Sequence, residues 1–157
     1  MIKIAVVDDK INNRKVITDK LSRNDLFKLV FQAVNGEDFF QQMKQLPEEE
    51  LPHIVLMDLE MPEVDGVSAI ATASSLYPAV KFVVLTIFDD DDKIFRAIRA
   101  GACGYLLKEE SSEVIIDMLV NLWESGAGPI SPSIAYKILQ IVQRPVASGE
   151  EKSDRKG

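Results

Sequence analysis

Five side chains that can do chemistry each stand at the end of a short apolar run. They are three carboxylates, a hydroxyl and an amine: Asp8, Asp9, Asp58, Thr86 and Lys108. If they meet, the carboxylates repel one another unless a cation neutralises them. Mg²⁺ suits such a cluster, because it prefers oxygen ligands and often combines a few carboxylates with a phosphate oxygen. A lysine adds a point charge for a phosphoryl oxygen. The set therefore indicates phosphoryl chemistry, with Asp58 as the nucleophile.

The apolar runs before these residues are typical of buried parallel strands. Strands are expected over residues 2–7, 28–34, 53–58, 81–86 and 104–108. The segments between them carry apolar residues at helical spacing. Five strands alternating with five helices predict an α/β fold with helices on both faces of a parallel sheet. Ligands of such sheets bind beyond the carboxyl ends of the strands, so the five side chains should surround one crevice.

Helical spacing also predicts which side chains form the core. The first helix, over about residues 11–22, should bury Ile17 and Leu21. The other stripes are Phe39, Phe40, Met43 and Leu46; Val67, Ile70, Ala71 and Ser74; Ile94, Ala97, Ile98 and Gly101; and Val114, Ile115, Met118, Leu119 and Leu122. Trp123 and the methionines are assigned to the core as well.

Composition fits one ordinary globular domain of 157 residues, with 46% hydrophobic and 27% charged residues. A net charge of −7 argues against non-specific attraction to nucleic acid or anionic lipid. The single cysteine, Cys103, excludes an intrachain disulfide, and no apolar run reaches the length of a membrane span. The N-terminus meets acid too early for a signal peptide, so a cytoplasmic location is expected.

A turn-rich break, GAGPISP, at residues 126–132 ends this pattern. Ser131 is a suitable N-cap and Pro132 a suitable first residue for one more amphipathic helix, which runs to residue 143. Residues 144–157 have almost no apolar content and should be disordered. The expected division is 1–125 for the main domain, 126–143 for a linker with its helix, and 144–157 for a tail.

The segments VVDD, VLMDLEMPEVDG, VVLT and GYLLK, at their spacing, resemble the receiver domain of bacterial two-component response regulators. The resemblance covers about residues 1–125. It implies a flavodoxin-like, doubly wound five-stranded sheet of order 2-1-3-4-5. It also implies that the domain accepts a phosphoryl group from a sensor histidine kinase. Such a domain is not an enzyme in the ordinary sense, since it catalyses only its own phosphorylation and slow dephosphorylation.

The resemblance assigns a role to each site residue. Asp58 is the phosphoacceptor, and Thr86 and Lys108 contact the phosphoryl oxygens. The metal is Mg²⁺, held by Asp9 directly, Asp8 mainly through water, Asp58 itself and the backbone carbonyl of Glu60. Tyr105 occupies the aromatic position that swings inward when Thr86 engages the phosphate. Phe88 stands where family members tune the lifetime of the phosphoryl group.

Three further segments, LTIFDDDD, AIRAGACGYLLKE and GAGPISPSIAYKIL, resemble receivers that precede a LuxR-type helix-turn-helix. This implies control of transcription, with a homodimer formed on phosphorylation. Too few residues follow the last helix for a DNA-binding domain, so the chain itself is expected to bind neither DNA nor membrane. The sequence leaves open whether it is a fragment of a longer regulator or a receiver that ends there.

Two other functions were weighed. A haloacid-dehalogenase-like phosphatase also uses a strand-end aspartate with Mg²⁺, but it needs a second aspartate where this chain has Glu60. A phosphate-independent interaction module would normally lack one of the five site residues. The lone histidine, His53, precedes the third strand at the opposite edge of the sheet and is assigned a surface or capping role. The acid run at residues 89–92 is assigned to capping of the fourth helix.

Overall fold

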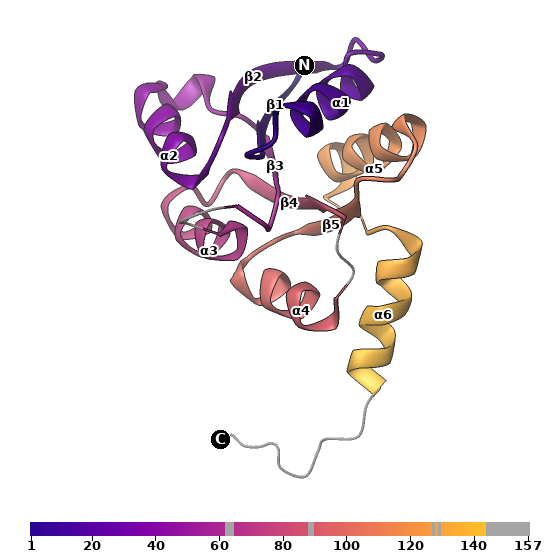
Figure 1. The fold of residues 1–157 in the computed structure, drawn as a ribbon. Helices are drawn as coiled ribbons and strands as arrows, with labels where there is room; N and C mark the ends of the chain where they lie inside the picture. Colours follow the sequence, from indigo (N-terminus) through magenta and orange to yellow (C-terminus); the bar gives the residue numbers. More distant parts are fainter. Residues whose placement is uncertain (62–64, 88–89, 127, 129, 144–157) are drawn as a thin grey trace.

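The computed structural model describes residues 1–61, 65–87, 90–126, 128 and 130–143. Strands and helices alternate through most of these residues (Figure 1). The strands are β1 (Ile2–Val7), β2 (Phe27–Ala33), β3 (Ile54–Met57), β4 (Lys81–Thr86) and β5 (Gly104–Leu107). The helices are α1 (Ile11–Leu21), α2 (Gly36–Gln45), the short 3₁₀ turn η1 (Glu48–Glu50), α3 (Gly66–Leu76), α4 (Asp91–Ala100), α5 (Ser112–Ser125) and α6 (Pro132–Gln143). The predicted tail and Phe88 lie outside the described residues.

The five strands form one parallel sheet of order β2-β1-β3-β4-β5, which confirms the predicted fold and strand order. Its register aligns the ends of the strands. Val7 of β1 pairs with Met57 of β3, so the residues that follow them, Asp8 and Asp58, lie level. The Asp58 amide donates to the carbonyl oxygen of Val7 at 3.0 Å. The sheet therefore fixes two of the three carboxylates through its own hydrogen bonds.

Alternate side chains of the strands feed two separate cores, because successive residues of a strand face opposite sides of the sheet. One core packs under α1 and α5, around Ile4, Leu56 and Leu119. The other packs under α2, α3 and α4, around Phe39, Ile70 and Phe82. Figure 1 shows the two groups of helices on opposite sides of the sheet. Both faces are covered, which explains why the central strands are apolar throughout.

The helical core predictions are right for Ile17, Leu21, Phe39 and Met43 but wrong at several other positions. In α3 the buried residues are Gly66, Ala69, Ile70 and Ala73, while Ala71 is exposed. In α4 Ile98 is 42% exposed, and in α5 Trp123 is 45% exposed. Small residues leave the buried stripe of α3 poorly marked. Trp123 instead stacks on His53, with the ring centroids 4.2 Å apart.

The segment after α5 packs against the edge strand β5. Ile130 forms a parallel bridge with Tyr105, and the Ser131 amide donates to the Tyr105 carbonyl oxygen at 3.1 Å. The Ser131 hydroxyl oxygen accepts from the amide of Leu107 at 3.0 Å, so this side chain bonds the sheet. Its carbonyl oxygen accepts from the first turn of α6. Ile134 of α6 is fully buried in the core under α4.

Helix starts in the site region are capped by side chains that the sequence marks. Asp90 accepts from the amides of Asp92 and Lys93, which confirms capping of α4 by the described part of its acid run. Asp65 caps α3 in the same way, through the amide of Ser68. Among the described residues, no helix combines the length and the apolar content that crossing a bilayer requires.

Candidate functional site

Asp58 directly follows β3, at the carboxyl end of the central strand, and is only 4% exposed. Asp9, by contrast, is only partly buried. A carboxylate as buried as Asp58 is expensive unless its charge is compensated. The groups that approach it therefore define the site.

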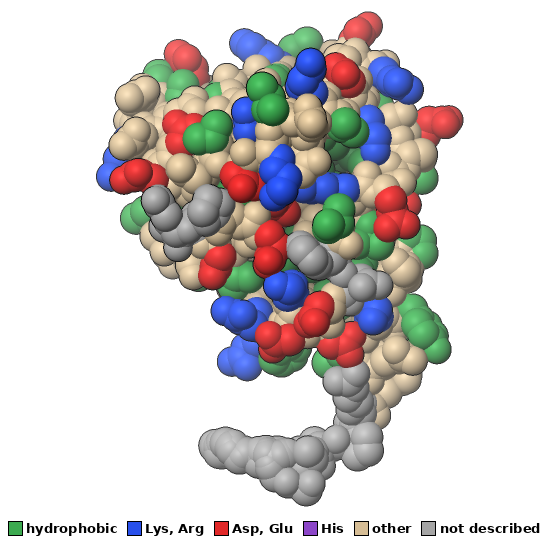
Figure 2. All heavy atoms as spheres, viewed as in Figure 1, with side chains coloured by type: hydrophobic (Ala, Val, Ile, Leu, Met, Phe, Trp, Pro, Cys, Tyr) green, Lys and Arg blue, Asp and Glu red, His purple; other side chains and the backbone are tan. Residues whose placement is uncertain are grey.

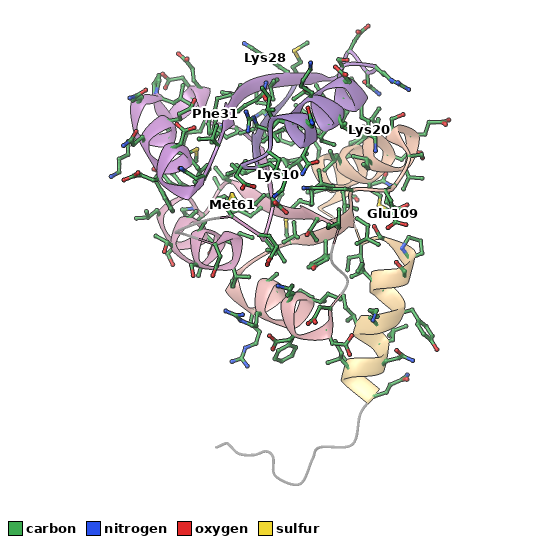
Figure 3. The ribbon with its side chains drawn as sticks, viewed as in Figure 1. Lys10, Lys20, Lys28, Phe31, Met61 and Glu109 are labelled. Carbon is green, nitrogen blue, oxygen red and sulfur yellow. The ribbon has the colours of Figure 1, made fainter. Side chains whose placement is uncertain are left out.

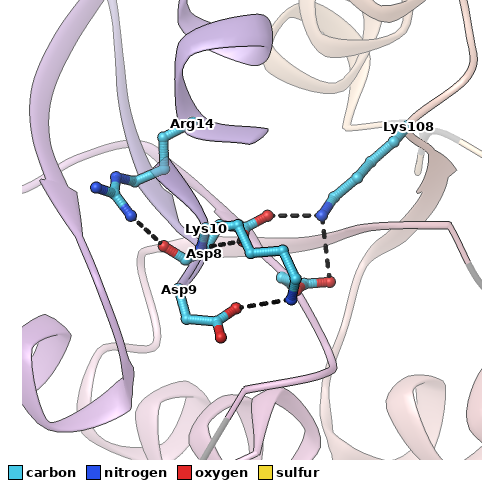
Figure 4. Close-up of polar contacts among 6 residues, drawn as sticks. Asp8, Asp9, Lys10, Arg14 and Lys108 are labelled. Carbon is cyan, nitrogen blue, oxygen red and sulfur yellow. Dashed lines mark hydrogen bonds and ion pairs between the residues drawn. The ribbon is translucent and has the colours of Figure 1, made fainter. Parts of the chain in front are cut away.

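Lys108 supplies the compensating charge. Its Nζ lies 2.6 Å from Oδ2 of Asp8 and 3.6 Å from Oδ1 of Asp58, so one ammonium bridges two buried carboxylates (Figure 4). The amide of Lys108 donates to the carbonyl oxygen of Thr86 at 2.8 Å, which holds the base of this side chain against β4. Lys108 thus meets Asp8, 100 positions away in the sequence, and Asp58, 50 positions away, as predicted.

The three carboxylates form a compact group. Asp8, Asp9 and Asp58 each offer an oxygen, and these oxygens lie within 4.8 Å of one another. Two of the three side chains are buried. Three hard oxygen donors facing one point fit Mg²⁺, which commonly takes a few carboxylates and completes its shell with water or phosphate oxygen.

Asp58 holds its proton more tightly than an ordinary aspartate. Burial raises the pKa of its carboxyl from 3.8 to about 6, against the opposing attraction of Lys108. The neighbouring Asp8 raises this pKa further, while a hydrogen bond from the Glu60 backbone lowers it. Such a shift indicates a carboxylate whose charge is incompletely met by the protein, which is common at functional sites.

Two cationic residues at the site were missed by sequence reasoning. Nζ of Lys10 lies 3.3 Å from Oδ1 of Asp9, and the Lys10 amide donates to Oδ1 of Asp8 at 2.9 Å. Nη1 of Arg14 donates to the carbonyl oxygen of Asp8 at 2.7 Å. Figure 3 shows Lys10 at the middle of this edge, and Figure 4 shows it beside the acids. The signal was available, since Lys10 directly follows the acid pair.

Gly66 is required by a close approach of two segments. A Cβ at this position would stand 2.2 Å from the carbonyl oxygen of Asp58 and 2.7 Å from the Cα of Leu59. The Gly66 amide donates to the Leu59 carbonyl oxygen at 3.0 Å. The absence of a side chain here lets the start of α3 lie against the backbone of Asp58.

The remaining predicted residues lie around this centre. Thr86 ends β4 and is fully buried. The Glu60 side chain forms an ion pair with Lys93 of α4 at 2.7 Å. The role of the Glu60 backbone carbonyl as a metal ligand stays a prediction. Tyr105 is fully buried in the core shared with Ile134 of α6. It is already inward in this structure, so its predicted swing stays a prediction. Of the predicted loop residues, Met61 is buried and Pro62 lies outside the described residues.

Known proteins share this arrangement. The sequence matches the response regulator receiver domain family over residues 4–120, which is most of the chain. The chain belongs to that family. The match carries the acid pair, Asp58, Thr86 and Lys108 inside one recognised domain. Residues 130–143, which pack on β5 and α4, lie outside the matched range.

Curated relatives include the transcriptional regulatory protein DegU of Brevibacillus brevis, 31% identical over 99% of this chain and 64% of the relative. LnrK of Bacillus subtilis, also a transcriptional regulatory protein, is 34% identical over 92% of this chain and 63% of the relative. The receiver thus spans less than two thirds of these regulators.

Solved structures agree on the fold. A LuxR-family two-component response regulator from Aurantimonas sp. SI85-9A1 superposes with a TM-score of 0.81, at 23% identity, over 90% of this chain and 98% of that one. The BeF3-activated DrrB receiver domain gives a TM-score of 0.67 at 29% identity, over 79% and 98% of the two chains. The receiver assignment is therefore confirmed.

Receiver domains are signalling domains whose general function is a phosphorylation-dependent switch in response regulators. They generally bind Mg²⁺ at an acidic cluster, and this chain has such a cluster in Asp8, Asp9 and Asp58. Receivers interact with histidine kinases, and one solved relative is an RcsB structure described as two dimers bound to two parallel DNAs.

Proposed function

We propose that Asp58 accepts a phosphoryl group from a phosphohistidine of a sensor kinase, with Asp8 and Asp9 holding Mg²⁺ beside it. The observation that carries this proposal is the buried Asp58 carboxylate within 3.6 Å of Lys108 and within one compact group with Asp8 and Asp9. Bound Mg²⁺ would supply positive charge for the phosphoryl oxygens. The Glu60 carbonyl is the fourth proposed protein ligand.

The chemistry is an in-line exchange of one bond for another. A carboxylate oxygen of Asp58 attacks phosphorus, the P–N bond to the donor imidazole breaks, and its electron pair leaves with the imidazole nitrogen. Lys108 starts as the counterion of Asp8 and Asp58 and turns to a phosphoryl oxygen as charge develops there. Catalysis is then mainly positioning and charge neutralisation. The chain acts as its own phosphotransfer catalyst and hydrolyses the product slowly.

Phosphorylation would bias a two-state element on the side of β4 and β5. Thr86 closes on the phosphoryl group, and Tyr105 with its surroundings repacks. Ile134 shares a core with Tyr105, so α6 lies next to this change. We propose residues 1–125 as the receiver, 126–143 as the linker with its helix and 144–157 as a tail. The output is transcriptional control, as in the transcriptional regulatory proteins DegU and LnrK, through a DNA-binding domain, with a homodimer formed on phosphorylation.

Metal-dependent labelling tests the proposal. The full chain is incubated with acetyl phosphate and Mg²⁺, and its intact mass is measured. One phosphoryl addition is expected, none in excess chelator, and none for Asp58→Ala. A matched control is Asp65→Ala, which removes a nearby aspartate that caps α3 and should leave labelling in place. Undiminished labelling of Asp58→Ala would reject the proposal, and repeated turnover of a generic phosphate ester would favour a hydrolase.

A further inference from the structure

Lys20 is a cation outside the cluster that makes direct contact with the main chain of the site. It belongs to the last turn of α1. Its Nζ donates to the carbonyl oxygen of Lys108 at 3.1 Å and to that of Glu110 at 2.9 Å. The partners lie 88 and 90 positions away in sequence. Figure 3 shows Lys20 and the intervening Glu109 on neighbouring elements.

These two bonds close a frame around the backbone of Lys108. On one side the Lys108 amide donates to the Thr86 carbonyl oxygen at 2.8 Å. On the other side the Lys108 carbonyl oxygen accepts from Lys20. Hydrogen bonds from an ammonium are charge-assisted and stronger than those between neutral groups. The turn that begins at Lys108 is therefore held to β4 by its amide and to α1 by its carbonyls.

The frame sits against the reacting groups. A cavity of about 70 Å³ lies between α1 and the sheet, and Lys20 lines it together with Asp8, Asp58 and Lys108. The lysine ammonium is carried on a flexible four-carbon stem, so a fixed backbone at Lys108 limits the region that its Nζ can reach. A turn that loosens here would move the ammonium that bridges Asp8 and Asp58.

We propose that Lys20 is a positioning residue for phosphoryl transfer, acting through Lys108. It anchors the turn after β5 to α1 so that the Lys108 ammonium meets the phosphoryl oxygen as charge develops. This inference rests on the proposed function of Asp58. A small misplacement of a group at a reacting centre can slow a reaction by as much as about 10²-fold. Lys20 acts at one remove, so a smaller loss is expected.

The first experiment compares three variants of the full chain. Lys20→Met keeps the apolar stem and removes the donor, Lys20→Arg keeps a donor, and Lys15→Met removes an exposed charge from the same helix. The rate of labelling by acetyl phosphate at saturating Mg²⁺ should fall roughly fivefold to twentyfold in Lys20→Met. Lys15→Met should match the unaltered chain, and Lys20→Arg should recover most of the rate because its guanidinium can reach two carbonyls.

Two binding measurements distinguish a positioning role of Lys20 from a role in fold stability alone. Affinity for beryllofluoride, an inorganic mimic of the phosphoryl group, should fall in Lys20→Met by about the same factor as the rate. Affinity for Mg²⁺ should change less than about twofold, because Lys20 contacts none of the three carboxylates in the described contacts. A lowered melting temperature with unchanged beryllofluoride affinity would overturn the proposal.

The decisive comparison is made in a Lys108→Ala background. If Lys20 acts through Lys108, adding Lys20→Met there should slow labelling by less than about twofold. Independent, multiplicative losses would overturn the proposal, as would equal rates for Lys20→Met and the unaltered chain. Absence of any label on the unaltered chain would instead reject the proposed function, so the two failures are distinguishable.

Discussion

The two edges of the sheet treat their ionisable groups in opposite ways. At the carboxyl edge, the 4%-exposed Asp58 shares the partly buried Lys108 ammonium with Asp8. At the amino edge, hydrogen bonds and a ring contact hold His53 in the fold. Its amide donates to the Lys3 carbonyl oxygen, its Nδ1 accepts from the Lys3 amide, and its ring stacks on Trp123. One edge leaves charge incompletely met, and the other satisfies its polar groups.

Burial shifts the pKa of Asp58 and that of His53 toward the neutral form, but the two residues differ in how their surroundings satisfy them. Burial raises the pKa of Asp58 to about 6, which favours its neutral form. Burial also lowers the pKa of His53, which again favours the neutral form, with help from the charge of Lys3. A neutral histidine with both of its main-chain groups bonded is a structural residue. A buried carboxylate with a raised pKa, beside two other acids, is suited to bind a cation and accept a phosphoryl group.

The largest expected effect comes from removing the shared ammonium. Lys108→Ala leaves Asp8 and Asp58 facing each other without their counterion, and labelling by acetyl phosphate should slow by about 10²-fold or more. Lys28→Ala is the control, because it removes an exposed charge from β2 at the amino half of the sheet. A loss below about threefold in Lys108→Ala would show that the ammonium is dispensable.

Stability should respond with opposite signs at the two edges. A raised pKa means that the folded state binds a proton more tightly than the unfolded chain, so folding stability falls as pH rises from about 4 through about 6. Asp58→Asn removes this cost. Without Mg²⁺ at pH 7.5 it should be more stable than the unaltered chain by about 1–3 kcal/mol, and the gain should shrink by pH 5. Urea unfolding at both pH values is the measurement. Equal stability at pH 7.5 would contradict the claim of unmet charge.

His53→Ala should have the opposite effect, a loss of about 1–2 kcal/mol at pH 7.5. Because the folded-state pKa of His53 is lowered, its contribution is present above the ordinary value of 6.5 and is lost as pH falls below it. The penalty of the substitution should therefore shrink on acidification. Labelling at Asp58 should be unaffected. A labelling defect in a folded His53→Ala chain would break the division between the two edges.

The smallest effect concerns Lys10. Its ammonium lies 3.3 Å from Asp9 on an exposed side chain and competes with a cation for that carboxylate. Lys10→Met should tighten Mg²⁺ binding by roughly twofold to fivefold at low salt, and less at high salt, because exposed ion pairs are weak and screened. Isothermal titration with Mg²⁺ at two ionic strengths measures this. Weaker binding in the variant would show that Lys10 supports the metal site.

Much of the fold could be predicted because its signals are local. Continuous apolar strands, short helices between them and acids at strand ends predict a covered parallel sheet with Asp58 and Lys108 at one edge. Buried stripes made of small residues were harder to predict, since Ala71 and Ala73 of α3 are the same residue type, yet Ala71 is exposed and Ala73 is buried. Trp123 has a core-like side chain, yet its ring partner is His53 from a distant segment.

Apart from Lys10 and Arg14, the parts of the site that sequence reasoning missed depend on contacts between segments that are distant in the sequence. Nothing local marks the bonds of Lys20 to carbonyl oxygens 88 and 90 positions away. The constraint on Gly66 comes from the backbone of Asp58, whose carbonyl oxygen would clash with a Cβ at this position. Ser131 stands directly before the first residue of α6, as predicted, but nothing local marks the bond that its hydroxyl accepts from the amide of Leu107 on β5. Such contacts follow from the packed fold.

The most direct test of the central claim is to locate the phosphoryl group. The full chain is labelled with acetyl phosphate and Mg²⁺, the acyl phosphate is reduced with borohydride to give homoserine, and peptides are sequenced by tandem mass spectrometry. The account predicts homoserine at position 58 and nowhere else, with none formed in excess chelator. Modification at Asp8 or Asp9, or labelling of Asp58 that persists without metal, would contradict it.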